Sequence, residues 1–222
     1  MTDSARRGTR DRLVAAPRED LCLDFANTRY WRGTAPPSET LHGFADLIAW
    51  CETAGALDQA GAADLLTWGA RHQGQAAALL GEAIAAREAI YGLFAATASG
   101  HAAADADIAA LNRLLEKTAG RQSVVVAPAG NMWRLPPAAP QIASLLAPVF
   151  WSTGDLLVGR HLQKVRLCAN EKCGWVFLDD SKSGTRRWCA MRSCGNRAKA
   201  HRHYMRKTKP ERAAAVDPAK AR

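Results

Sequence analysis

Residues 166–197 read RLCANEKCGWVFLDDSKSGTRRWCAMRSCGNR and contain four of the six cysteines of the 222-residue chain. These four, Cys168, Cys173, Cys189 and Cys194, follow the pattern C-x4-C-x15-C-x4-C. A short turn can direct two thiolates at one point about 2.3 Å away, and two such turns complete a tetrahedron around Zn²⁺. Because four cysteines leave no coordination position for water, the spacing predicts one structural zinc ion.

Other interpretations of the four cysteines stay open. They could form two disulfides or be unrelated buried residues, although disulfides fit poorly with a cytoplasmic chain. A nearby histidine, namely His161, His201 or His203, could also replace one cysteine as a ligand. Zinc binding would supply folding energy that a module of about 50 residues cannot obtain from its core alone.

The charge of the chain is unevenly distributed. The formal net charge is +9, but residues 1–159 are mildly acidic, and residues 160–209 carry a large excess of Lys and Arg over Asp and Glu. A local basic excess of this kind indicates a polyanionic partner, most often nucleic acid. A solubility tail is the alternative. It fits less well, because the basic residues alternate with Trp, Cys and Gly.

The end of the basic module predicts a helix that begins at an N-cap, Asn196, and stops before Pro210. Basic residues recur in it at three- and four-residue steps, so they share one face. We expect that face to contact phosphates or to enter a groove. A second stripe is expected to pack on the zinc core: Ala198, His201, Met205 and Thr208. The expected nucleic-acid contacts, including arginines around the second cysteine pair, are Arg186, Arg187, Arg192, Arg197, Lys199, Arg202, Arg206 and Lys209.

The rest of the chain predicts a helix-rich domain with a small antiparallel sheet. Alternation over Leu21–Phe25 favours a strand, and residues 123–127 and 132–135 favour a hairpin. Apolar residues at helical spacing predict helices over residues 41–54, 59–72, 75–99, 105–119 and 138–158, the last kinked at Pro148. The expected fold class is α+β, with a C-terminal treble-clef-like zinc finger that starts with a hairpin over residues 165–178.

We divide the chain into four expected segments. Residues 1–18 form a flexible tail, 19–159 the α+β domain, 160–209 the finger and 210–222 a second flexible tail. The sequence shows neither a secretory signal nor an apolar run long enough for a membrane helix, so a cytoplasmic location without membrane contact is expected.

The sequence shows no catalytic motif or acid/base pair of diagnostic spacing, so no enzymatic activity is expected. A polar and aromatic cluster follows the first expected strand next to Asp24. An arginine and an aromatic ring there could hold a small anion, although ordinary turn chemistry explains the same residues. The residues proposed for this ligand site are Asn27, Arg29, Trp31 and Arg32.

The run from Cys189 to Arg197 contains the sequence C-G-N-R and resembles the CGNR zinc fingers, as do residues 166–179. The run LCLDFANT at residues 21–28 resembles the opening of the ABATE domain, which commonly precedes this finger. The resemblance implies a two-domain bacterial protein of a family described as stress-induced transcription regulators. It assigns the zinc ligands to the four cysteines, and it assigns Gly195, Asn196 and Arg197 to the motif that opens the helix.

The expected function is therefore a zinc-binding, DNA-binding transcription regulator. Its N-terminal domain would sense a small-molecule effector or form a homodimer. An RNA-binding module that stacks bases on Trp175 or Trp188 is one alternative. Others are a zinc module that docks on a protein and a metal-dependent nuclease that uses His201 and His203.

Overall fold

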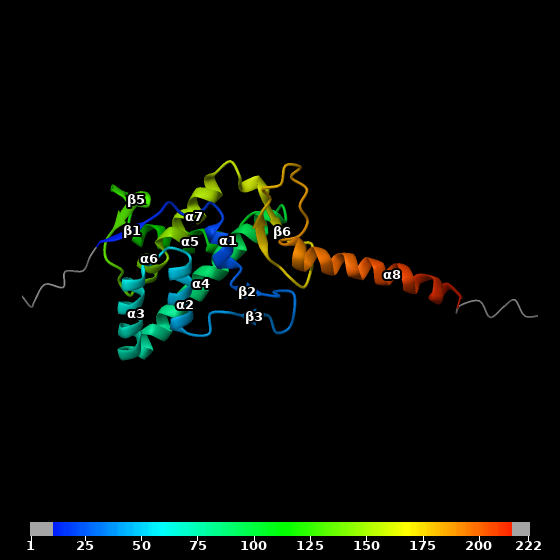
Figure 1. Cartoon of the computed structure of the whole chain (residues 1–222), viewed down its shortest axis with the longest axis horizontal. Coiled ribbons are helices and arrows are strands. Elements are labelled where there is room, and N and C mark those ends of the chain that lie inside the picture. The colour runs from blue at the N-terminus through cyan, green and yellow to red at the C-terminus, as the bar shows by residue number, and fades with distance from the viewer. Residues whose placement is uncertain (1–10, 215–222) are drawn as a thin grey trace, which may run out of the picture.

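The computed structural model describes residues 11–214, with side chains described up to Met205. A body of packed helices lies at one end, and the C-terminal helix extends away from it (Figure 1). The elements, in chain order, are β1 (Arg12–Val14), α1 (Leu21–Ala26), β2 (Arg29–Tyr30), β3 (Ser38–Glu39), α2 (Phe44–Thr53), α3 (Gln59–Arg71), α4 (Gln73–Ala98), α5 (Asp105–Lys117), β4 (Val124–Ala127), β5 (Gly130–Leu135), α6 (Ile142–Leu145), α7 (Ala147–Val158), the 3₁₀ turn η1 (Leu162–Lys164), β6 (Val165–Leu167), β7 (Val176–Leu178), the π-helical turn η2 (Met191–Gly195) and α8 (Asn196–Ala214).

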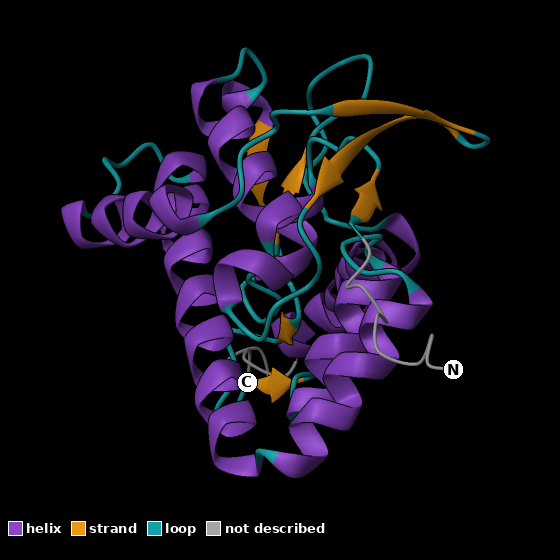
Figure 2. Cartoon of the chain, turned by 90° about the vertical axis from the view of Figure 1, so that its left-hand side faces the viewer, coloured by secondary structure: helices purple, strands orange, loops and turns teal. Residues whose placement is uncertain are grey.

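Helix α4 is the central element of the body and contacts α1, α2, α3, α5, α6 and both β6 and β7. Its 26 residues are rich in alanine, and small side chains such as Ala83 and Ala86 allow neighbours to approach closely on several sides. Ile90 and Phe94 add the larger apolar surface on the same helix, and both are fully buried. Figure 2 shows the helical body from one side, with its helices packed together and the strands at their edges. In the described residues, no helix combines the length and the apolar composition needed to cross a bilayer.

The strand predicted over Leu21–Phe25 is wrong, because these residues form helix α1. The alternation of Leu21, Leu23 and Phe25 does not mark one buried face, because Cys22 is buried as well. Only Asp24 faces outward, so the segment is buried on almost all sides. A short buried helix then satisfies its own backbone while it packs between α4 and α7. The helices predicted over residues 41–119 are confirmed to within a few residues at each end.

The predicted hairpin is confirmed as β4 and β5, which pair with Val124 opposite Trp133. Strand β1 joins the free edge of β5, giving the order β1-β5-β4. The interpretation of residues 1–18 as a tail is therefore wrong over Arg12–Val14, because Val14 is buried and the side chain of Arg12 donates to Ala56 O at 2.9 Å. Residues 1–10 lie outside the described part of the chain.

Two predictions about proline differ from the structure. The single helix predicted over residues 138–158 with a kink at Pro148 is instead two helices, because α6 ends at Leu145 and α7 begins at Ala147. Pro148 lies in the first turn of α7, where its missing N–H costs nothing. The stop expected at Pro210 is wrong, because α8 continues to Ala214. Proline has a helical φ angle, and it removes one hydrogen bond without forcing the helix to end. The rest of the expected C-terminal tail, residues 215–222, lies outside the described residues.

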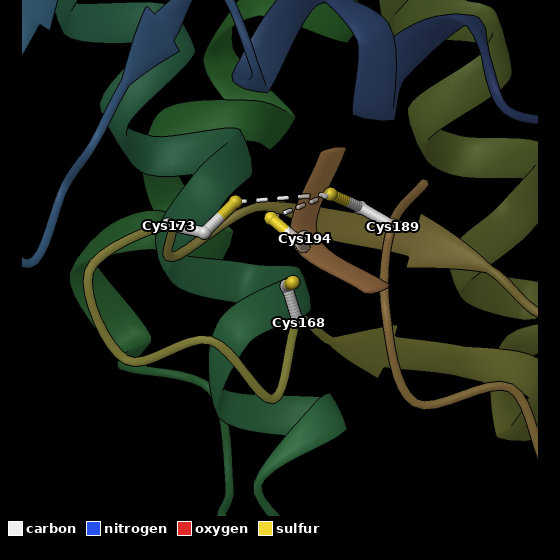
Figure 3. A group of neighbouring side chains, drawn as sticks. All are labelled: Cys168, Cys173, Cys189 and Cys194. Carbon is white, nitrogen blue, oxygen red and sulfur yellow. Dashed lines mark hydrogen bonds between the residues drawn. The ribbon is translucent and has the colours of Figure 1, made fainter. Parts of the chain in front are cut away.

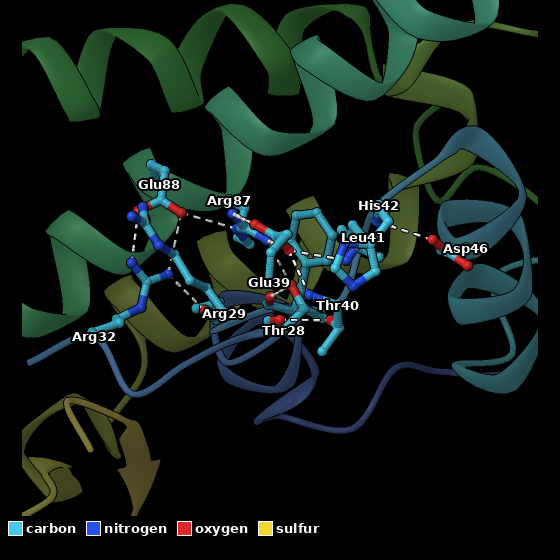
Figure 4. Close-up of polar contacts among 12 residues, drawn as sticks. Thr28, Arg29, Arg32, Glu39, Thr40, Leu41, His42, Asp46, Arg87 and Glu88 are labelled. Atoms are coloured by element: carbon cyan, nitrogen blue, oxygen red, sulfur yellow. Dashed lines mark hydrogen bonds and ion pairs between the residues drawn. The ribbon is translucent and has the colours of Figure 1, made fainter. Parts of the chain in front are cut away.

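A buried arginine ties the β2–β3 strands to α4. The guanidinium of Arg87 is 1% exposed and pairs with both carboxylate oxygens of Glu39, at 2.6 and 2.7 Å. Its Nε also donates to Glu88, which in turn accepts from Arg32 at 2.7 Å (Figure 4). Burial by itself raises the pKa of Glu39, but hydrogen bonds from Arg87 and from the N–H groups of Leu41 and Thr40 outweigh it, lowering the pKa to about 2.

We predict a loss of stability in acid that comes from Glu39. A carboxyl whose pKa is lower in the folded state than its ordinary 4.5 stabilises the fold above pH 4.5. That contribution is lost as the pH falls toward 2. Urea midpoints measured between pH 7 and pH 2 should show this decline, and Glu39→Gln should be less stable at pH 7 with a shallower decline. An identical pH dependence in the variant would contradict the assignment.

Candidate metal centre and nucleic-acid interface

The four cysteines predicted as metal ligands come together at one point between β6, β7 and η2. Their sulfur atoms all lie within 4.8 Å of one another, and Figure 3 shows the four side chains converging. The sulfur of Cys189 lies 3.7 Å from that of Cys173 and 3.9 Å from that of Cys194. A tetrahedral site with Zn–S bonds of about 2.3 Å requires sulfur atoms about 3.8 Å apart. The donor set and its spacing therefore fit one zinc ion.

The backbone around the first cysteine pair forms a tight turn. The carbonyl of Asn170 accepts from the N–H of Cys173 at 2.7 Å. Gly174 follows with φ +66, a left-handed conformation, and a Cβ there would come within 2.8 Å of the Cβ of Arg32. Only glycine meets both conditions without strain. The N–H of Cys168 donates to the carbonyl of Trp175 at 2.8 Å, which closes the β6–β7 hairpin over the sulfur cluster.

The second cysteine pair is held by a chain of polar contacts. The buried carboxylate of Asp179 accepts from the N–H of Arg186 at 2.9 Å and from the hydroxyl of Ser181. The side chain of Arg186 donates to the carbonyls of Trp188, at 3.0 Å, and Cys189. Arg186 thus holds the loop that carries Cys189. The sequence predicted only a nucleic-acid contact for this residue and not this structural role.

The alternative ligands and the disulfides are not supported. A disulfide requires sulfur atoms about 2.05 Å apart, far less than the distances here. The ring of His161 instead contacts Glu19 at 2.7 Å, and His201 and His203 are exposed on α8. The remaining two cysteines, Cys22 and Cys51, are fully buried in the body, where burial raises the pKa of each thiol to about 12.

The finger, predicted to begin at residue 160, packs closely on the body. Val165 and Val176 of the hairpin belong to the main hydrophobic core of the body. The side chain of Asn27 donates to the carbonyl of Val176 at 2.7 Å and accepts from its N–H at 3.2 Å. The N–H groups of Arg32 and Gly33 donate to carbonyls of the first cysteine turn, at 3.1 and 3.3 Å. We call these contacts the seam.

The residues predicted to hold a small ligand lie at this seam. Trp31 has φ 51, an uncommon value for a large side chain, and packs against the cysteine cluster. Arg32 pairs with Glu88, and its guanidinium lies 3.7 Å from the ring centre of Tyr91. Arg29 also contacts Glu88, at 3.4 Å. These contacts, with those of Asn27, explain the four residues without a ligand, so the ligand site stays an untested prediction.

The predicted nucleic-acid residues fall into two groups. Arg186 is half-buried in the structural contacts described above, whereas the others whose side chains are described are exposed: Arg187, Arg192, Arg197, Lys199 and Arg202. The guanidinium of Arg197 lies 4.4 Å from the ring centre of Trp31. Those of Arg187 and Arg202 lie 5.4 and 5.9 Å from that of Trp188. The side chains of Arg206 and Lys209 lie outside the described residues.

Two predictions about α8 are wrong. Asn196 is not an N-cap, because the π-helical turn η2 runs directly into α8 and the Asn196 backbone is already helical. The stripe expected to pack on the zinc core does not do so: His201 and Met205 are exposed and Ala198 is only half-buried. Thr208 lies outside the described side chains. The helix instead projects from the finger (Figure 1).

The fold and the site define a class of protein: a helix-rich α+β domain joined to a four-cysteine zinc finger. The profile of the ABATE family, described as "Putative stress-induced transcription regulator", matches residues 19–160, and that of the CGNR zinc finger matches residues 164–207. The chain therefore belongs to the ABATE family and carries a CGNR zinc finger that binds one structural zinc ion. No curated protein matches the chain.

Zinc should protect the four ligand thiols from modification. We predict one zinc ion per chain and little reaction of any of the six cysteines with a thiol reagent before chelation, because Cys22 and Cys51 are buried. After chelation, four thiols should react first. A metal-indicator titration combined with thiol counting checks this. Rapid reaction of the four thiols without zinc release would contradict the site.

The close approach at the seam predicts opposite effects of two glycine substitutions. A Cβ at Gly33 would overlap the carbonyl oxygen of Glu171, whereas one at Gly81, on α4, would meet nothing within 4 Å. Gly33→Ala should lower the free energy of unfolding by about 1–3 kcal/mol. Gly81→Ala should raise it by about 0.5–1 kcal/mol, since alanine favours the helix. Urea unfolding of the zinc-loaded variants measures both, and equal effects would contradict the seam.

Proposed function

We propose that the chain is a DNA-binding transcription regulator whose helix α8 lies against the phosphate backbone of duplex DNA. The N-terminal domain senses a small-molecule effector or forms a homodimer, and the protein acts in the cytoplasm. The proposal assigns no reaction to the chain, because four cysteine thiolates leave no open position on the metal.

The exposure of α8 is the observation that carries the proposal. From Asn196 to Met205 every described side chain is exposed except that of Ala198, which is half-buried. A helix gains most of its stability in a protein by burying an apolar face, and no side chain of this stretch is buried. Its surface is strongly basic, with Arg197, Lys199 and Arg202 among ten residues. A polyanion is the kind of partner that such a basic surface attracts.

The aromatic contacts favour duplex DNA over single-stranded RNA. Base stacking requires an open aromatic face. Trp175 stacks on Tyr30, with ring centres 5.2 Å apart, and Trp188 is half-buried against the cysteine cluster with two arginines near its ring. Part of the surface of each ring is therefore already covered within the protein. The charged side chains of α8 up to Met205 are the exposed cations Arg197, Lys199 and Arg202, which are suited to phosphates.

The test is fluorescence anisotropy of the zinc-loaded protein with a labelled random duplex, titrated with salt. Each phosphate contact contributes about −0.9 to the slope of log K against log salt. Replacing Arg197, Lys199 and Arg202 together by alanine should reduce the slope by up to about 2.7. The matched control replaces three exposed cations of the body, Arg71, Arg113 and Lys117, and should leave the slope unchanged.

The absence of binding at low salt would overturn the proposal, because counterion release does not depend on sequence. Equal losses in the two triple variants would show that net charge rather than α8 is responsible. Tighter binding of single-stranded RNA than of duplex would favour the RNA-binding alternative. Zinc content and thermal melting of each variant establish that the fold is retained.

A further inference from the structure

We propose that a hollow at the seam between the body and the finger binds a small organic cation with a flat apolar part. The hollow has a volume of about 500 Å³, within the range of small-molecule sites. Its wall combines residues from α1, from the β2–β3 segment, from α2 and from the finger. Five side chains determine the proposed ligand chemistry: Asp24, Tyr30, Asp46, Trp50 and Trp175.

The charged side chains that line the hollow are acidic. Asp46 accepts from the backbone N–H groups of His42 and Gly43, at 2.9 and 3.0 Å (Figure 4). Within the described residues it forms no ion pair, so its negative charge has no basic side chain against it. Asp24 pairs with Arg18, whose side chain is 64% exposed. A cation in the hollow would find one carboxylate that has no basic side chain against it and a second that is paired with an exposed arginine.

Three aromatic rings supply the apolar surface. The rings of Tyr30 and Trp175 stack, with 26° between their planes. Trp50 packs its ring against Phe25, with ring centres 4.9 Å apart, and lies on the same hollow. Aromatic faces beside carboxylates attract ammonium and amidinium groups, because the negative face of the ring quadrupole and the negative carboxylates both attract a cation.

The other polar side chains of the wall already have partners. Asn27 uses both its oxygen and its nitrogen on Val176, and the hydroxyls of Thr28 and Thr40 donate to the carbonyls of Phe25 and Thr28. The arginines once expected to hold an anion here, Arg29 and Arg32, pair with Glu88 and do not line the hollow. The chemistry of the wall therefore excludes an anion and selects a cation.

The hollow is mechanically connected to the zinc site. Trp175 lies two residues after Cys173, and its carbonyl accepts from the N–H of Cys168. A ligand against Trp175 thus touches the hairpin that carries two of the four zinc ligands. That such a ligand acts as an effector of DNA binding rests on the proposed function. The binding itself does not, so it is measured without DNA.

The experiment is calorimetric titration of the zinc-loaded full chain with phenethylammonium chloride at neutral pH and low salt. The uncharged 2-phenylethanol and the anion phenylacetate have the same ring and serve as comparison probes. We expect phenethylammonium to bind one per chain and at least about tenfold more tightly than the alcohol, and phenylacetate not to bind.

Two variants locate the site. Asp46→Asn keeps an acceptor oxygen for the N–H groups of His42 and Gly43 but removes the charge, and it should weaken phenethylammonium binding about tenfold. The control Asp64→Asn removes an exposed charge from α3, outside the hollow, and should have no effect. If Asp46→Asn fails to fold, Tyr30→Leu provides a second test. Tyr30 is 39% exposed, and removing its ring should weaken phenethylammonium binding.

Equal binding of the three probes would overturn the proposal, as would unchanged affinity in both Asp46→Asn and Tyr30→Leu. No binding of phenethylammonium up to millimolar concentrations would also overturn it. None of these results alters the salt dependence of DNA binding, so the failure of this inference and the failure of the proposed function are distinguishable.

Discussion

The structure depends on the packing of the β6–β7 hairpin into the helical body. Each strand has only three residues, too few to form an independent core, yet Val165 and Val176 are buried with the side chains of α1 and α4. Asn27 fixes the register of this packing through two hydrogen bonds to one residue. The zinc ion then connects the hairpin to the second cysteine pair, so the metal site and the hydrophobic core stabilise each other.

This arrangement determines where the basic helix lies. Because η2 carries Cys194 and runs directly into α8, the zinc site fixes the direction in which the helix leaves the body. Arg197 additionally contacts Trp31 of the body across the seam. A basic arm anchored in this way is presented to a partner in one orientation, which lowers the entropy cost of binding. The acidic hollow lies at the same seam. A ligand bound there would contact Trp175, which belongs to the hairpin that carries two of the zinc ligands.

The metal site and most helices could be predicted from the sequence, because cysteine spacing and apolar periodicity are local signals. The seam could not be predicted. The boundary at residue 160 was placed by charge and composition, and no local pattern shows that Val165 and Val176 share a core with α1. The strand predicted over Leu21–Phe25 is wrong for a similar reason, because alternation alone does not show that neighbouring helices bury both sides of the segment. The left-handed Trp31 and the close approach at Gly33 depend on tertiary contacts and leave no sequence signal.

The most direct test of this account is hydrogen exchange of the full chain with zinc bound and after chelation. If the finger and the body share one core, chelation should reduce the protection of the amides in β6 and β7 and also in α1, which has no metal ligand. Faster exchange throughout α1 is the predicted result. Full protection of α1 after zinc removal, with changes confined to residues 165–214, would show two independent units and contradict the account.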